Sequence, residues 1–284
     1  MNAMRVFVVG GTGVIGRQLM PRLVERGHKV VALVLEGEAA GWLSQLGIEC
    51  AVGNILSPAD LRAPLRSCDA AIHVATAVPR PGQPVDWTLN DRIRTEGTAN
   101  LLNACRDLGV ERYIQQGVVH LTADGTDQLR DEDAPPHPTR ATESSIEMER
   151  LVKESGLGWT ILRGGILYGP HAGQDEAWRA AARDGSLSLP GDGRGFISLI
   201  HVVDYARAVI TALEHEPKRT VFNVVDDEPV PYATLFQHIA AVERGPSPKP
   251  GGAVVWASCR ASNSRMRETF GWSPVYATYR SGWS

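Results

Sequence analysis

The chain has 284 residues, a formal net charge of −3 and four cysteines. That length allows one or two domains with a sizeable core, and the near-neutral charge gives no reason to expect nucleic acid or an anionic membrane as partner. The cysteines form no Cys-x-x-Cys pair, so we expect neither a metal site nor a disulfide framework, and a reducing cytoplasm fits. Val6–Val9 is too short for a signal peptide, and no apolar stretch approaches the roughly 20 residues of a membrane span.

A glycine-rich stretch, Gly10-Gly11-Thr12-Gly13-Val14-Ile15-Gly16, follows the apolar run 6–9 and leads into a helical apolar pattern over 14–25. In such a strand–turn–helix, the first glycine of the Gly-x-x-Gly-x-x-Gly spacing permits a tight turn. The second lets a pyrophosphate approach the backbone, and the third lets the helix pack close to the strand. The helix N-terminus adds free amides and a favourable dipole. This pattern predicts a dinucleotide site; the alternative is a purely structural glycine turn.

Strands and helices are then expected in alternation. The predicted strands are 29–35, 47–52, 69–74, 110–116 and 159–163, and the predicted helices are 58–65, about 87–108, and 142–155. Ser57 is expected to cap the first of these helices, with Pro58 at its first position. The Asp- and Pro-rich segment 123–138 is expected to be a loop. The alternation predicts an α/β fold with a doubly wound parallel sheet, and a dinucleotide-binding domain over 1–163.

After Gly164 the regular alternation of strands and helices ends. We expect helices over 178–183, 204–213 and 232–243, a strand and turn over 187–193, a strand over 221–225 and a Pro/Gly linker over 245–252. Asp204 is expected to cap its helix. Residues 164–284 should form mainly a small substrate-binding lobe over the carboxyl ends of the strands, where ligands bind in open α/β folds. Segments near 195–227 should return to the first domain.

Several further motifs follow in a specific order. They are Gly10-x-x-Gly13-x-x-Gly16, Gly53-Asn54, Asp69–Ala75, Gly97–Leu102, Thr160–Arg163, Tyr168-Gly169-Pro170, Pro190–Gly193, His201–Asp204, Phe222–Val224 and Phe270–Pro274. Over nearly its whole length the chain therefore resembles the extended short-chain dehydrogenases/reductases, in their epimerase–dehydratase branch, which have a Rossmann fold. The resemblance implies cofactor contacts from Gly10, Thr12, Gly13, Val14, Ile15, Gly16, Arg17, Leu35, Asn54, Ile55, Ala75, Thr76, Ala77, Ser145, Gly164, Gly165 and Ile166. It implies substrate contacts from Val78, His120 and Leu121.

The family's catalytic positions are a different matter. The family normally uses a Ser or Thr after the fifth strand, a Tyr-x-x-x-Lys on the next helix, and often an Asn on the helix before. By the same resemblance, Val118 stands at the Ser position, Ala141 at the Tyr position, Ser145 at the Lys position and Thr95 at the Asn position. No tyrosine occurs between residues 113 and 168, so a shift of register does not restore the motif. The usual proton donor is missing.

This absence leaves two hypotheses. In one, the protein is a catalytically silent NAD(P)-binding redox sensor or regulator. In the other, hydride transfer survives and the proton comes from a substrate phenol or from water. The whole pattern resembles atypical ketoreductases that tailor aromatic polyketides in antibiotic biosynthesis, angucyclinone 7-ketoreductases among them, which implies NADPH and a flat polycyclic ketone as the small-molecule partner. His120 and Thr95 are the weak side-chain candidates for an acid, although a rim residue and a helix-packing residue are the alternatives.

The cofactor preference depends on the end of the second strand. NAD enzymes place an acid there to bind the ribose 2′-hydroxyl, whereas NADP enzymes leave space and add arginine. Val34 and Leu35 carry neither signal, Arg17 could reach a 2′-phosphate, and Glu36 argues mildly against one. We expect NADPH, with NADH as the alternative. Ser145 could reach a ribose hydroxyl, and His73 is expected to be a core histidine bonded to backbone.

Overall fold

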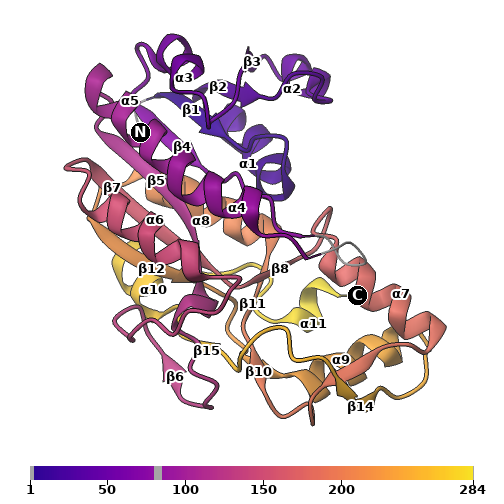
Figure 1. The fold of residues 1–284 in the computed structure, drawn as a ribbon. Coiled ribbons are helices and arrows are strands. Elements are labelled where there is room, and N and C mark those ends of the chain that lie inside the picture. Colours follow the sequence, from indigo (N-terminus) through magenta and orange to yellow (C-terminus); the bar gives the residue numbers. More distant parts are fainter. Residues whose placement is uncertain (1–2, 80–84, 284) are drawn as a thin grey trace.

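The computed structural model describes residues 3–79 and 85–283. Its centre is a sheet of seven parallel strands in the order β12-β7-β5-β4-β1-β2-β3 (Figure 1). The strands are β1 (Arg5–Val9), β2 (Lys29–Val34), β3 (Glu49–Val52), β4 (Ala70–His73), β5 (Arg112–Val118), β7 (Gly158–Gly164) and β12 (Thr220–Val224). The central strands are rich in valine and isoleucine and buried on both faces, as a parallel sheet requires. The doubly wound α/β fold is confirmed.

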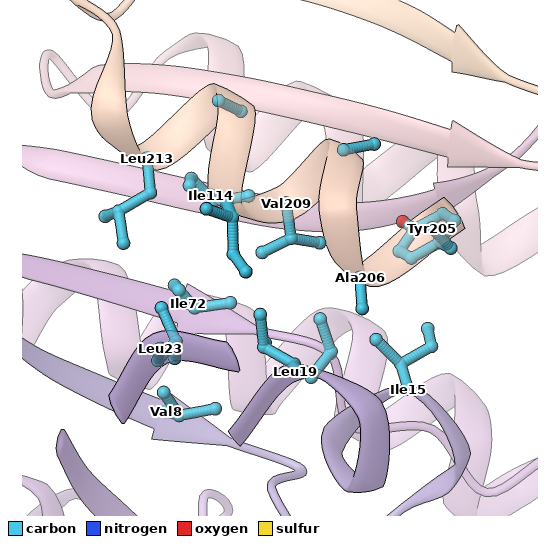
Figure 2. Packing of buried hydrophobic residues seen from close by; sticks show 14 of the residues in the cluster. Val8, Ile15, Leu19, Leu23, Ile72, Ile114, Tyr205, Ala206, Val209 and Leu213 are labelled. Atoms are coloured by element: carbon cyan, nitrogen blue, oxygen red, sulfur yellow. The ribbon is translucent and has the colours of Figure 1, made fainter. Parts of the chain in front are cut away.

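Helices cover both faces of this sheet. On one face α1 (Val14–Glu25) packs against α8 (Val202–Glu214), joined by α2 (Gly41–Gln45) and α10 (Ser264–Phe270). The side chains that meet between α1 and α8 in Figure 2 are Ile15, Leu19, Leu23, Ala206, Val209 and Leu213. The other face is covered by α3 (Pro58–Leu65), α5 (Thr98–Leu108) and α6 (Glu143–Lys153). Within the described chain, no helix is long and apolar enough to cross a membrane.

The strand order reverses between β1 and β4. In open α/β sheets this switch point, at the carboxyl ends of the strands, is where a crevice for ligands forms. The glycine turn follows β1, and residues 74–79 follow β4, so both border that crevice. The remaining strands direct their carboxyl ends to the same edge because all seven are parallel.

Apart from α8, β12 and α10, most of the elements after β7 build a smaller group at that edge (Figure 1). Its strand pairs are β8 (Ile166–Tyr168) with β11 (Leu199–His201), β9 (Ser188–Pro190) with β14 (Lys249–Gly252), and β10 (Phe196–Ile197) with β13 (Val230–Pro231). Its helices are α7 (Gln174–Asp184), α9 (Tyr232–Val242) and α11 (Tyr279–Gly282). They share an apolar cluster that includes Tyr168, Phe236 and Trp283. The division of the chain at residue 163 remains a prediction.

Several local expectations were wrong. The segment 245–252 contains β14 and pairs with β9, so it is not a free linker. The loop 123–138 contains β6 (Leu129–Arg130), which pairs with β15 (Arg260–Ala261). His201, whose Nδ1 accepts from Val203 N, caps α8 in place of Asp204. The Asp204 carboxylate instead accepts from the backbone amides of residues 275 and 276, because the C-terminal segment folds back over it.

Two helices also differ from expectation. Ser57 occupies the N-cap position of α3, but its side chain makes no capping hydrogen bond within the described residues. The helix expected over 87–108 is three consecutive pieces, α4 (Thr88–Arg92), the π-helical η1 (Ile93–Gly97) and α5. A π-helical turn inside a helix is often found at functional sites. The short 3₁₀ helix η2 (Val119–Thr122) continues from β5.

Candidate cofactor and substrate site

Gly10, Gly13 and Gly16 have different structural roles in the turn. Gly10 has φ +92°, and a Cβ there would lie 2.5 Å from Ala75 N. A Cβ at Gly16 would lie 2.2 Å from Gly11 O, so this glycine lets α1 pack against the turn. Gly13 is exposed, and a Cβ there would meet only Gly10 O, at 3.3 Å. The backbone at Gly13 therefore faces open space rather than protein.

The N-terminus of α1 begins at this turn. Gly13 is its N-cap, and among the described side chains none caps the helix and no acid lies in its first turn. The amides of Val14, Ile15 and Gly16 are thus left for an anion, which the helix dipole also favours. These features fit the pyrophosphate of a dinucleotide. Arg17 is exposed, with its guanidinium carbon 5.7 Å from the centre of the Trp42 ring.

An acidic side chain closes the end of β2. The Glu38 carboxylate accepts a hydrogen bond from Leu35 N at 2.9 Å and another from the Thr12 hydroxyl. It therefore lies between the glycine turn and the strand end at which adenosine ribose is bound in this kind of fold. The sequence analysis considered Glu36 but missed Glu38, because a turn at Gly37, with φ +74°, directs the later residue back.

The segments after β3 and β4 carry the next predicted contacts. Asn54 Oδ1 accepts from Leu56 N at 2.9 Å, so its side chain shapes the local turn, and Ile55 is buried nearby. Ala75 and Ala77 are half-buried and Thr76 is exposed. Ala77 N donates to the fully buried Asn90 Oδ1 at 3.1 Å, and within the described residues Asn90 Nδ2 has no hydrogen-bond partner. Sequence reasoning missed Asn90, a buried polar residue on α4.

Gly164 and Gly165 lie where β7 ends. A Cβ at Gly164 would lie 2.7 Å from Tyr205 Cε2, and one at Gly165 would lie 2.7 Å from Ser198 O. Close packing therefore accounts for both glycines. Ile166 follows in β8 and is half-buried.

The positions assigned to the family's catalytic residues contain no tyrosine or lysine. Val118 ends β5, Ala141 precedes α6, and Ser145 is buried with no hydrogen-bond partner for Oγ in the part of the chain that is described. Arg94 Nη1 donates to Ala141 O at 2.8 Å and to Ser144 Oγ at 3.3 Å, and burial lowers the pKa of Arg94 to about 10. The guanidinium stays charged at neutral pH. Sequence reasoning missed Arg94. The signal that could have found it is a basic residue on the inner face of the helix expected over 87–108.

The two weak acid candidates are differently placed. The Thr95 hydroxyl donates to Asp91 O at 2.8 Å, within its own helix. His120 is buried, and neither ring nitrogen has a hydrogen-bond partner among the described residues. Burial lowers the pKa of His120 to about 4, so the imidazole is neutral at pH 7. Leu121 beside it is buried, whereas Val78 is exposed.

His73 is a buried residue at the end of β4, as expected. The backbone of Ile93 lies near enough to the ring to raise its pKa by hydrogen bonding, but neither ring nitrogen meets ordinary hydrogen-bond geometry with the described residues, so the expected bond to backbone stays a prediction. Burial lowers its pKa to about 4, and it is neutral at pH 7.

A cavity of about 380 Å³ opens at Ala141, one of the positions described above. Its wall includes Val85, Trp87, Arg140, Ala141 and Val255. A cavity of this volume is large enough for a small molecule. A second cavity, of about 1180 Å³, lies among the residues that precede β1, β4, β5 and β7. It is at the amino ends of the strands, away from the ligand-binding edge of such sheets.

Comparison with known proteins identifies the family of this chain. The model of the NAD dependent epimerase/dehydratase family matches residues 6–224. The chain belongs to this family. A 3-diazoavenalumate denitrifying reductase of a Streptomyces species is 34% identical, over 98% of this chain and 99% of the relative. A 4-hydroxy-2-methyl-3-oxo-4-farnesyl-3,4-dihydroquinoline-1-oxide ketoreductase of Stigmatella aurantiaca is 28% identical, over 80% of this chain and 70% of the relative.

Solved members of the epimerase/dehydratase family share the fold. The UDP-glucose 4-epimerase of Thermus thermophilus, solved with NAD, is 22% identical with a TM-score of 0.82, covering 99% of this chain and 96% of the epimerase. A dTDP-glucose 4,6-dehydratase variant from Streptomyces venezuelae has a TM-score of 0.85 at 18% identity, covering 98% and 94%. At these identities the likeness establishes the fold alone.

Proposed function

We propose that this family member is an NAD(P)H-dependent ketoreductase that reduces a ketone of a polycyclic aromatic polyketide in antibiotic biosynthesis. The sequence pattern resembles the angucyclinone 7-ketoreductase of simocyclinone biosynthesis, and we propose a reaction of the same type. The observation that carries the proposal is Ala141: it lines the cavity at the position of the family's tyrosine and has no proton to donate. The chain therefore keeps a cofactor turn and a substrate-sized cavity without the usual acid.

The chain's own residues bind and orient the cofactor, which supplies the hydride when it is bound. The open backbone at Gly13 and the uncapped amides of α1 fit the pyrophosphate. Ser145 Oγ, buried without a hydrogen-bond partner among the described residues, is available for a ribose hydroxyl. We expect NADPH to be used; its 2′-phosphate requires Glu38 to leave the amide of Leu35.

The proton is proposed to come from a phenol beside the substrate ketone, or from water. Three candidate side chains among the described residues are poorly suited to supply it. The Thr95 hydroxyl donates within its helix, His120 is neutral, and the guanidinium of Arg94 holds its proton at pH 7. The chain then contributes orientation of the ketone and exclusion of solvent, which together are worth at most roughly 7–11 kcal/mol.

The test is single-residue replacement by side chains that cannot donate a proton, namely Thr95→Val, His120→Phe and Ser145→Ala. Oxidation of NADPH is followed with polycyclic ketones that carry or lack a hydroxyl beside the carbonyl. We expect turnover of the hydroxylated ketones if a phenol is the donor and of both kinds if water is, and falls in kcat of about tenfold or less for each variant. A fall of about a thousandfold for one variant, with cofactor affinity intact, would identify a dedicated side-chain acid. Tight cofactor binding without turnover of any substrate would favour the sensor hypothesis.

One relative favours a second candidate reaction. The 34% identical protein is named as a denitrifying reductase of a diazo compound. Replacing an aryl diazonium group by hydride forms a C–H bond, breaks the C–N bond and releases N₂, so the protein supplies no proton. This chemistry also suits a cavity lined by Ala141. Including an aryl diazonium salt in the substrate panel, with N₂ release as the readout, distinguishes the two reactions.

A further inference from the structure

Three aromatic side chains form a row beside the cavity. The ring centres of Trp87 and Trp256 are 6.4 Å apart, with the rings edge to face at 79°. Those of Trp256 and His120 are 5.1 Å apart, at 51°. The three residues come from separate segments: Trp87 precedes α4, Trp256 precedes β15, and His120 lies in η2. Only the tertiary fold brings them together.

The hydrophobic core does not explain this row. Trp87 and Trp256 are half-buried, and within the described chain neither indole belongs to any of the buried apolar clusters. Trp272 and Trp283, by contrast, are buried core residues. Indoles outside the core leave ring surface available for a ligand. The buried ring of His120, with no hydrogen-bond partner among the described residues, adds unused polar groups at the inner end of the row.

Exposed apolar side chains lie at the cavity beside this row, together with the polar Asp86, Thr139 and Arg140. Val85 is 76% exposed and Val255 is 69% exposed, and both line the cavity together with Trp87. Val254, beside Val255, is exposed as well. Exposed large apolar side chains gathered at a cavity mark a binding surface rather than ordinary solvent-facing residues. The cavity is also lined by Asp86, Thr139, Arg140 and Ala141, and the Ala141 side chain is only a methyl group, which leaves room for a flat ring system.

We propose that Trp256, supported by Trp87, is a stacking wall that selects planar aromatic substrates and holds them against Ala141. The inference rests on the proposed function, since it concerns the substrate of that same site. Aromatic rings attract one another at centre separations of about 4.5–7 Å, in offset or edge-to-face arrangements, beyond the gain from burying their area. A planar tricyclic ketone would extend the existing row, whereas a puckered ketone of similar polarity would lose this contact.

The test uses 1,8-dihydroxyanthraquinone, a planar ketone flanked by phenols, and 2-decalone, a non-planar ketone. Binding of each to the full chain is measured by calorimetry for the wild type, Trp256→Leu and Trp256→Phe. Trp178→Leu is the matched control, because Trp178 is also half-buried but packs against Phe236 in α9. We expect Trp256→Leu to weaken anthraquinone binding by about tenfold or more, and Trp256→Phe to retain most of it. Trp178→Leu should bind the anthraquinone as the wild type does.

The affinity of NADPH should be the same in all four proteins, which shows that each variant is folded at the cofactor site. Wild-type binding of the anthraquinone by Trp256→Leu would overturn the proposal, as would failure of the wild type to bind this probe. Equal weakening for decalone and anthraquinone would also overturn it, because a general loss of apolar surface would then explain the effect. If the Trp256 effect is found but no ketone is turned over, the stacking wall stands and the proposed reduction fails.

Discussion

Gly13 allows cofactor binding to be separated from folding. Its backbone is extended, with φ −73° and ψ −177°, so an alanine adopts it without backbone strain, and the added Cβ would lie 3.3 Å from Gly10 O, a tight contact that a small shift relieves. At Gly16 the same change puts a Cβ 2.2 Å from a backbone oxygen, and at Gly10 it also opposes a φ of +92°. We therefore expect Gly13→Ala to fold, and the other two alanine variants to lose much of their stability.

The size of the effect follows from what the new methyl group blocks. Alanine is a poorer N-cap than glycine, and losing this preference at α1 costs up to about 1 kcal/mol. For a protein of this length that lowers Tm by roughly 2–4 °C. A methyl group at the open face of Gly13 removes at least one hydrogen bond between an amide and the charged pyrophosphate, worth about 1.5–3 kcal/mol. The affinity should fall by about 10–150-fold.

The assay is calorimetric titration of NADPH and NADH at one salt concentration. Gly195→Ala is the matched control: Gly195 also lacks a positive φ, and its Cβ would meet only Ser258, at 3.7 Å. This control should bind both cofactors with wild-type affinity. A folded Gly13→Ala that binds NADPH and NADH as tightly as the wild type would refute the assignment of the glycine turn as the pyrophosphate site.

Three further predictions follow from charged side chains. Glu38→Gln removes the anion beside Leu35 N and should raise affinity for NADPH more than for NADH; equal changes in fluorescence titrations would contradict this. Burial raises the pKa of Glu149, but ion pairs with Arg163 and Lys153 outweigh burial and hold this pKa below its usual value. The carboxylate therefore stabilises the fold at pH values above its usual pKa, and this stabilisation is lost on acidification. Arg163→Met should therefore cost about 3–5 kcal/mol in urea unfolding at pH 7, and less near pH 4; a cost independent of pH would count against it. Burial raises the pKa of Asp226 to about 8, so stability present in acid falls as pH rises towards 8. Asp226→Asn should flatten Tm between pH 5 and 9, and a parallel shift of the two curves would exclude this origin.

The cofactor side of the site was the more predictable part. The glycine spacing, the apolar strand before it and the helical pattern after it all lie within 20 residues, so local periodicity and turn chemistry indicate their structure. The family resemblance extended this reading and is confirmed by the match over residues 6–224. The individual contacts assigned to cofactor and substrate, Gly13 and Ser145 among them, remain predictions.

The local expectations that were wrong share a physical cause. Asp204 has the residue type of an N-cap, yet His201 caps α8 and the carboxylate bonds to backbone that lies 71 residues further along the chain. The Pro/Gly segment 249–252 has no strand periodicity, and only its partner β9 makes it a strand. In both cases a long-range contact outweighs the local preference, and no local pattern encodes that contact.

The sequence by itself determined the alternation of strands and helices and the glycine turn, because these depend on hydrophobic period and backbone freedom over short spans. The tertiary structure alone decided that Glu38 bonds to Thr12 in the glycine turn, that Arg94 reaches Ala141, and that Trp87, Trp256 and His120 form one row. The last two depend on how distant segments pack at the carboxyl edge of the sheet. Side chains brought together in this way share no spacing in the sequence, so their chemistry becomes visible only in the folded chain.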